Sequence, residues 1–254
     1  RLALRMHGLS ALAAEEVPLW QRFVSAVGLL VMIVLAWALS YDRKAFPTRV
    51  VAWGLGLQLG FGFVVLRTPV GLAFFSTMND AFLRLLSFTA DGSRFLFGDY
   101  LDAHFTMALN VLPTIIFFSA LMSVLYHVGA MQYVVRGFAW IMQRTMRTSG
   151  AETLSAAANI FVGQTEAPLV VKPFVATMTD SELMAVMVGG FANTAGGVLA
   201  AYVGMLSSRF PDIAGHLMAA TVMSAPASLF LAKVILPEKG TPKTAGSLEM
   251  SDEK

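Results

Sequence analysis

The chain has 254 residues, of which 56% are hydrophobic and 13% charged, and its mean hydropathy is +0.67. Soluble domains carry about 25% charged residues, so this composition predicts a membrane protein. The small net charge of +2, spread between apolar blocks, argues against nucleic-acid binding, and the lack of cysteine excludes disulfides and thiolate chemistry. No metal site or cofactor is expected from the four histidines, whose spacing is not typical of ligands: His7, His104, His127 and His216.

Residues 1–22 form a lead-in without an initial methionine, so we expect the chain to start inside a longer one. A membrane-spanning helix needs about 20 largely apolar residues. Four segments meet this requirement: 23–40, 50–66, 105–126 and 213–236. Pro226 predicts a kink in the last segment, and Pro237 predicts its end. We assign residues 23–148 to a scaffold of transmembrane and interfacial helices.

Two segments of this scaffold are amphipathic. Residues 69–104 mix charges with apolar residues at helical spacing, so part of the segment either lies flat at the membrane interface or packs on other helices. Residues 129–148 predict a basic connecting helix in the headgroup layer, with Trp140 on it. Its predicted apolar face comprises Met131, Val134, Val135, Phe138, Ile141 and Met142.

Two helix-start signals follow. Ser149 and Glu152 have the S-x-x-E spacing of a capping box, and Thr179 and Glu182 repeat the pattern as T-x-x-E. A helix is therefore predicted to begin directly after each cap residue. Residues 150–178 form one bounded unit between the two signals.

The middle of this unit is polar. Residues 163–168 read Gly-Gln-Thr-Glu-Ala-Pro and place Glu166 in an otherwise apolar segment. A carboxylate at the bilayer centre costs on the order of 3 kcal/mol, so such residues usually face a cavity, a partner or a solute. Each flanking arm of about eleven residues would be roughly 16 Å long, about half the hydrocarbon thickness. These lengths favour a re-entrant helical hairpin over the alternative, a single kinked helix.

The next helix, 180–206, is also interrupted. Its apolar stretch contains four glycines and the pair Asn193-Thr194, although small residues also serve close helix packing. Two consecutive broken segments match the design of secondary transporters, in which half-helix ends and freed carbonyls contact the solute and the coupling ion. We therefore assign residues 149–237 to a transport domain that ends with the helix 213–236.

The polar residues at the two breaks suggest roles. Gln164 and Glu166 can bind polar edges of a solute, whereas Asn159, Asn193 and freed carbonyls can supply oxygen ligands for a small cation. Proton coupling through Glu166 is the alternative. An intramembrane enzyme would need a nucleophile and base that the sequence does not display, and a non-transporting scaffold would use the breaks only to pack helices.

Three sequence blocks, in this order, resemble the concentrative nucleoside transporter family. They are VLPTIIFFSAL at 111–121, AANIFVGQTEAPL at 157–169 and SELMAVMVGG at 181–190. The resemblance extends over roughly residues 20 to 240 and is densest from 105 to 206.

The resemblance implies an all-α transporter with an inverted-repeat fold, located in the plasma membrane or the bacterial inner membrane. It also implies a homotrimer that drives nucleoside uptake with an ion gradient, usually of sodium. It implies that the hairpin tip and an apolar wall contact the nucleobase: Gln164, Thr165, Glu166 and Val198. It also implies a sodium site between the tip and the break in the next helix, formed by Asn159, the Val162 carbonyl, Asn193 and the Thr194 carbonyl.

The family pattern includes a second, inverted half whose hairpin and helices hold the ribose. No second hairpin motif is found in this chain, and residues 238–254 predict a polar loop or tail that would lead into that half. We therefore expect the chain to be a fragment with the nucleobase-binding half of the site, unable to transport by itself.

Overall fold

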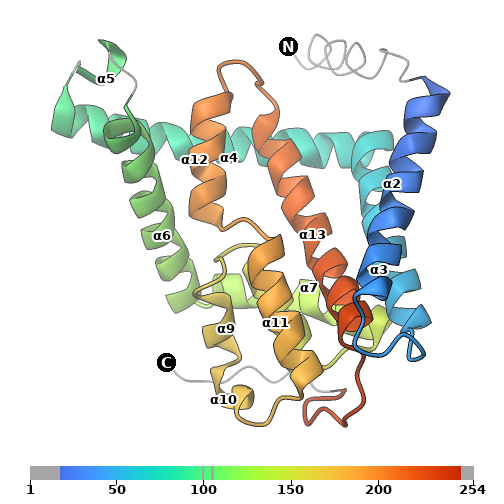
Figure 1. The fold of residues 1–254 in the computed structure, drawn as a ribbon. Coiled ribbons are helices and arrows are strands. Elements are labelled where there is room, and N and C mark those ends of the chain that lie inside the picture. The colour runs from blue at the N-terminus through green and yellow to red at the C-terminus, as the bar shows by residue number, and fades with distance from the viewer. Residues whose placement is uncertain (1–17, 99, 104–105, 247–254) are drawn as a thin grey trace.

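The computed structural model describes residues 18–98, 100–103 and 106–246. Over these residues every regular element is a helix, which confirms the predicted all-α class (Figure 1). The lead-in up to residue 17 and the tail beyond residue 246 lie outside the described residues.

The long helices run between the two ends of the molecule in Figure 1. They include α2 (Leu19–Ala38), α3 (Thr48–Arg67), α6 (Leu112–His127) and α13 (Ile213–Ile235). In the described part of the chain, four stretches are long and apolar enough to cross a membrane: Thr48–Val65, Met107–His127, Asp180–Leu206 and Ile213–Ile235. Three of them match predicted spans. The predicted span 23–40 is apolar over the shorter stretch Phe23–Ala38, and α13 continues past Pro226 and ends before Pro237.

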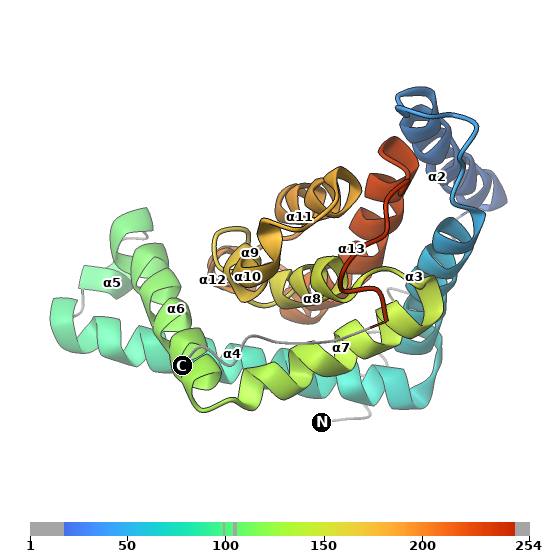
Figure 2. The same cartoon turned by 90° about the horizontal axis from the view of Figure 1, so that it is seen from below.

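A second set of helices lies crosswise. Helix α4 (Pro69–Phe97) crosses one end of the bundle and α7 (Ala130–Met146) the other (Figure 1), and both lie along the same side (Figure 2). The short helices α5 (Tyr100–Ala103) and η1 (Met107–Val111) connect α4 to α6. Helix α4 buries Phe75 and Phe82 against α13, α6 and α12, so part of its apolar surface packs on other helices, whereas Phe74, Phe88 and Phe95 are exposed.

Helix α7 covers the segment predicted as a basic connecting helix with an apolar face. Its buried stripe comprises Met131, Val135, Ala139, Met142 and Met146. Within the predicted apolar face, Val134 and Ile141 are exposed, whereas Ala139, which lies outside that face, is fully buried. The buried stripe lies where α7 packs on α8, α6 and α3, and the small Ala139 side chain permits close approach.

Helix α8 (Gly150–Asn159) is the innermost element. Every one of its residues is buried, against α7 on one side and α11 and α13 on the other (Figure 2). The chain reverses after α8 and returns through α9 (Ala167–Val170) and α10 (Lys172–Val175). We expected one continuous returning arm, but it divides at Val171 because Pro173 has no N–H to continue the helix.

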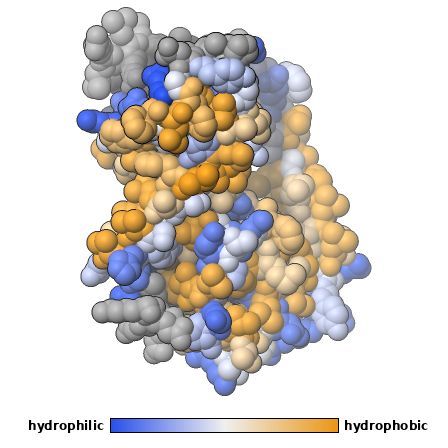
Figure 3. Space-filling view, turned by 90° about the vertical axis from the view of Figure 1, so that its left-hand side faces the viewer, coloured by the Kyte–Doolittle hydropathy of each residue, from blue (hydrophilic) through white to orange (hydrophobic). Residues whose placement is uncertain are grey.

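The interrupted segment forms two helices, α11 (Asp180–Ala192) and α12 (Gly196–Leu206), separated by residues 193–195. Both predicted capping boxes are present: Ser149 and Glu152 cap α8, and Thr179 and Glu182 cap α11. Figure 3 shows the face that carries α5 and α6, where apolar surface predominates and polar patches lie both in the middle and toward the ends.

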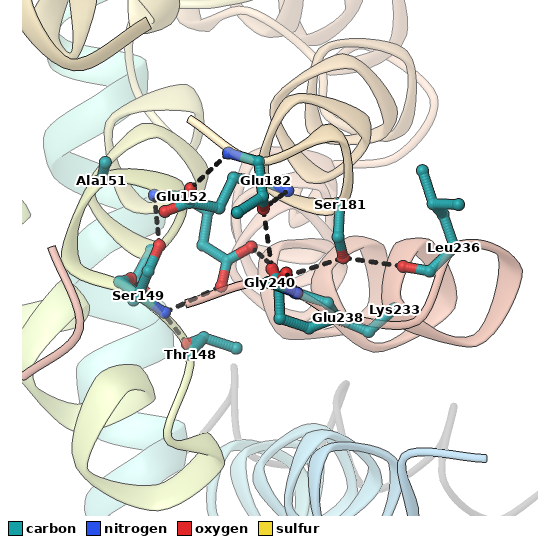
Figure 4. Close-up of polar contacts among 12 residues, drawn as sticks. Thr148, Ser149, Ala151, Glu152, Ser181, Glu182, Lys233, Leu236, Glu238 and Gly240 are labelled. Atoms are coloured by element: carbon teal, nitrogen blue, oxygen red, sulfur yellow. Dashed lines mark hydrogen bonds and ion pairs between the residues drawn. The ribbon is translucent and has the colours of Figure 1, made fainter. Parts of the chain in front are cut away.

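A buried ion pair joins the starts of α8 and α11 to the end of α13 (Figure 4). Lys233 of α13 lies 2.8 Å from Glu152, and their side chains are only 5% and 1% exposed. The Lys233 ammonium also donates to the Ser181 hydroxyl at 3.0 Å and contacts Glu238 at 3.1 Å. One lysine therefore connects three segments that are distant in sequence.

Residues 238–246, predicted as part of a polar loop or tail, complete this network. The Gly150 and Ala151 N–H groups donate to the carbonyl and hydroxyl of Thr244, at 2.9 and 3.2 Å. Burial raises the pKa of Glu238, but the charge of Lys233 and hydrogen bonds from Thr179 and Gly240 lower it more, so its pKa lies below the ordinary value. Glu238 is thus held ionised beside Lys233.

We expect Lys233→Met to destabilise the protein by about 3–5 kcal/mol, because it leaves the buried Glu152 carboxylate without its partner. The measurement is the melting temperature of the purified protein. Lys239→Met is the matched control, because Lys239 also pairs with a carboxylate, Asp42 at 2.7 Å, but its side chain is 58% exposed. A control variant that lowers the melting temperature as much as Lys233→Met would contradict the prediction.

Candidate functional site

The tip between α8 and α9 exposes its polar residues. Gly163 has φ +108, a conformation that glycine adopts without strain, and its carbonyl accepts from the Ala167 N–H at 2.9 Å. Gln164, Thr165 and Glu166 follow and are all exposed. The Thr165 hydroxyl donates to Glu166 Oε2 at 2.7 Å, which orients the carboxylate. Three of the four predicted nucleobase contacts are therefore consecutive, exposed residues of the tip.

The tip packs directly on the break between α11 and α12. The Gly196 N–H donates to the Phe161 carbonyl at 3.1 Å, so the N-terminus of α12 is capped by the tip. A Cβ at Gly163 would lie 2.6 Å from the Ala195 Cβ, and one at Gly196 would lie 2.6 Å from the Phe161 oxygen. Glycine at both positions is required by this close approach.

Asn159 connects the C-terminal ends of α8 and α11. Its Nδ2 donates to the Gly189 carbonyl at 2.5 Å, while its buried Oδ1 has no hydrogen-bond partner among the described residues. Asn193, directly after α11, accepts a short hydrogen bond from the Ser224 hydroxyl through its Oδ1. Because the C-terminal end of a helix carries partial negative charge, two such ends side by side favour a cation.

The other predicted ion ligands lie in the two contacting loops. Val162 is in the tip next to Phe161, and Thr194 is in the break two residues before Gly196, which bonds Phe161. Backbone oxygens outside regular helices at such a contact suit a small hard cation. Val198 lies in the first turn of α12, is 39% exposed, and does not line the cavity that Glu166 borders.

A cavity of about 550 Å³ separates the hairpin from α6. Its hairpin wall includes Phe161, Glu166 and Leu169. Its opposite wall comprises Phe118, Ser119, Met122, Ser123 and Tyr126 of α6, with Gln132 of α7. The sequence reasoning missed these α6 side chains and Ser224, although polar residues inside an otherwise apolar predicted span were a usable signal.

Two family descriptions match the chain: residues 27–100 match the "Na+ dependent nucleoside transporter N-terminus", and residues 108–209 match "Nucleoside recognition". The chain belongs to the concentrative nucleoside transporter family. With its apolar helices, it is a multi-pass membrane protein. The family resemblance of the sequence is thereby confirmed.

The chain is similar, along most of its length, to several curated members of this family. It is 45% identical over 240 residues to Sodium/nucleoside cotransporter 1 of Mus musculus, covering 91% of this chain and 36% of that protein. It is 44% identical over 230 residues to Solute carrier family 28 member 3 of Eptatretus stoutii, covering 89% and 33%. The chain thus spans about a third of the length of these curated relatives.

Solved structures of CNTnw share the fold of this family member. The inward-facing, substrate-bound state has a TM-score of 0.81 and 42% identity, and covers 86% of this chain and 54% of that one. A CNTnw variant in an outward-facing state gives a TM-score of 0.82 with 41% identity, and covers 91% and 56%.

We expect Gly196→Ala to lower the melting temperature by the equivalent of about 1–3 kcal/mol, because its Cβ would force the tip away from the break. Gly204→Ala on the same helix is the matched control, since a Cβ there meets nothing within 4 Å and alanine favours helix. Thermal unfolding of the purified variants measures both. An unchanged melting temperature for Gly196→Ala would contradict the close contact.

Proposed function

We propose that the protein is a sodium-coupled nucleoside symporter of the cell membrane, and that this chain carries the nucleobase-binding part of its solute site. The observation that carries the proposal is the exposed tip Gln164-Thr165-Glu166 fixed against the break at residues 193–195. The names of the relatives, which are sodium/nucleoside cotransporters, supply the solute class and the ion.

The tip suits a nucleobase chemically. A base edge presents both donors and acceptors, and the tip offers an amide with both, a hydroxyl and a carboxylate. Glu166 Oε2 accepts from Thr165, so the carboxylate keeps acceptor capacity for an N–H of the base. Val198, partly exposed on α12, would supply an apolar wall for the base plane.

The junction of the two half-helices suits sodium. The buried Oδ1 of Asn159, which has no partner in the described part of the chain, is an oxygen that a cation would satisfy, beside the negative ends of α8 and α11. Asn193 and the carbonyls of Val162 and Thr194 would complete the set. Such a site would link ion binding to the position of the tip, because Val162 directly precedes Gly163.

The other functions considered have weaker support. Proton coupling through Glu166 would need no cation ligands, and the relatives are named for sodium. A scaffold role would leave Glu166 without purpose at an exposed tip, and an enzyme role agrees with none of the relatives' names. Assembly as a homotrimer in the lipid bilayer belongs to the same proposal.

We expect Glu166→Gln in the full-length protein to abolish sodium-stimulated uridine uptake into vesicles while leaving assembly intact. The amide replaces a charged acceptor with a weaker acceptor and a donor, so the base loses a charge-assisted hydrogen bond. Asp180→Asn, which neutralises an exposed carboxylate at the start of α11, is the control and should transport normally. Normal uptake by Glu166→Gln would refute the role of Glu166.

We expect Asn159→Ala to raise the sodium concentration for half-maximal uptake by roughly tenfold or more, because a charge-associated contact is lost. Asn79→Ala is a matched control: Asn79 is equally buried but bridges α4 to the Pro211 carbonyl and the Gly215 N–H. It should lower stability without changing the sodium dependence. Uptake that ignores sodium but depends steeply on pH would favour the proton-coupled alternative.

A further inference from the structure

One face of α6 carries a polar stripe inside an apolar helix. Ser119, Ser123 and Tyr126 are spaced by four and three residues, so they lie along the same side of the helix. All three line the cavity of about 550 Å³ opposite the hairpin tip, and Gln132 of α7 continues the stripe. A helix that only faced lipid or packed on apolar neighbours would not need these groups.

The hydroxyl of Tyr126 strengthens this observation. It is buried and has no hydrogen-bond partner within the part of the chain that the structure describes. A buried hydroxyl without a partner is costly, and native proteins usually satisfy such groups with protein, water or ligand. Since Tyr126 lines the cavity, an occupant of the cavity can supply the missing partner.

The cavity has the character of a small-molecule site. Its volume lies in the range of about 300–1,000 Å³ that is usual for ligand pockets. Phe118, Phe161 and Leu169 give it apolar and aromatic walls against which a flat ring can pack. A few polar groups lie among them, with Glu166 on one wall and the α6 stripe on the other.

We propose that the α6 stripe, with Tyr126 as its main group, is a second contact surface for the nucleobase of the solute, across the cavity from Glu166. This inference rests on the proposed nucleoside transport. The base edge that leaves or approaches the tip would exchange hydrogen bonds with Tyr126, Ser123 and Gln132, so that its polar groups stay satisfied in an apolar surrounding. The stripe would then affect solute affinity and choice of base, and not the ion.

The test compares Tyr126→Phe with Tyr133→Phe in the full-length protein, using sodium-driven uridine uptake into vesicles. Tyr133 lies on α7, is 77% exposed and does not line the cavity, so its variant controls for loss of a tyrosine hydroxyl. Tyr126→Phe should raise KM for uridine roughly twofold to tenfold, the effect of one neutral hydrogen bond, without changing the sodium dependence. Tyr133→Phe should match the wild type.

A contact with the base also predicts selectivity. Among uridine analogues that each lack one polar group of the base, one should have the same KM in Tyr126→Phe as in the wild type, because its partner group is already missing. An unchanged KM for uridine, or an equal rise for every analogue, would overturn the proposal and leave the cavity to water or packing. Failure of the wild type to take up any nucleoside, purine or pyrimidine, would instead overturn the proposed function.

Discussion

The buried ammonium of Lys233 holds together the first turns of α8 and α11, the two helices whose other ends form the site. Its contacts with Glu152 and Ser181 reach the first turns of α8 and α11, and the contact with Glu238 ties in the segment after α13. Removing an ion from water is expensive, so this lysine is tolerated only where its partners are held in place. The cap residues hold two of these partners: the Ser149 N–H donates to Glu152, and the Thr179 hydroxyl donates to Glu238, both at 2.8 Å.

The polarity of the helices then determines what the opposite ends can bind. At the starts of α8 and α11, backbone N–H groups and the Lys233 ammonium meet carboxylates, which suits the positive ends of helix dipoles. At their other ends the carbonyls converge near Asn159 and Gly189, which carry no cationic side chain. Helices α8 and α11 thus run parallel: carboxylates gather at their N-terminal ends, and their C-terminal ends, near Asn159, favour a cation. The pair would keep its geometry as a unit because both helices share one anchor.

The sequence made the local features of this arrangement predictable, because they depend on residues close in the chain. The capping boxes of Ser149 and Thr179 and the break at Asn193 each depend on spacing within a few residues. Contacts between distant segments could not be predicted in this way. No feature of the sequence around Lys233 predicts that it pairs with Glu152. Thr244 lies in a segment whose composition predicted a polar tail. The buried Ala139 of α7 was missed for a related reason, since a close helix seam is determined by the partner helix.

Glu166, the residue that first pointed to function, avoids the free-energy cost of burying a carboxylate because its side chain is exposed, and not because it forms an ion pair. Among the described residues, the one side chain that hydrogen-bonds Glu166 is that of Thr165 in the same tip, and Glu166 lines a cavity. Gly163 and Gly196 allow the tip to pack closely against the start of α12, while Gln164, Thr165 and Glu166 remain exposed. A carboxylate that is oriented by a neighbouring hydroxyl, and that no cationic side chain of the described residues pairs with, can bind a ligand that brings its own donor. Glu152 differs from Glu166 because it forms a buried ion pair with Lys233, which stabilises the packing of the helices.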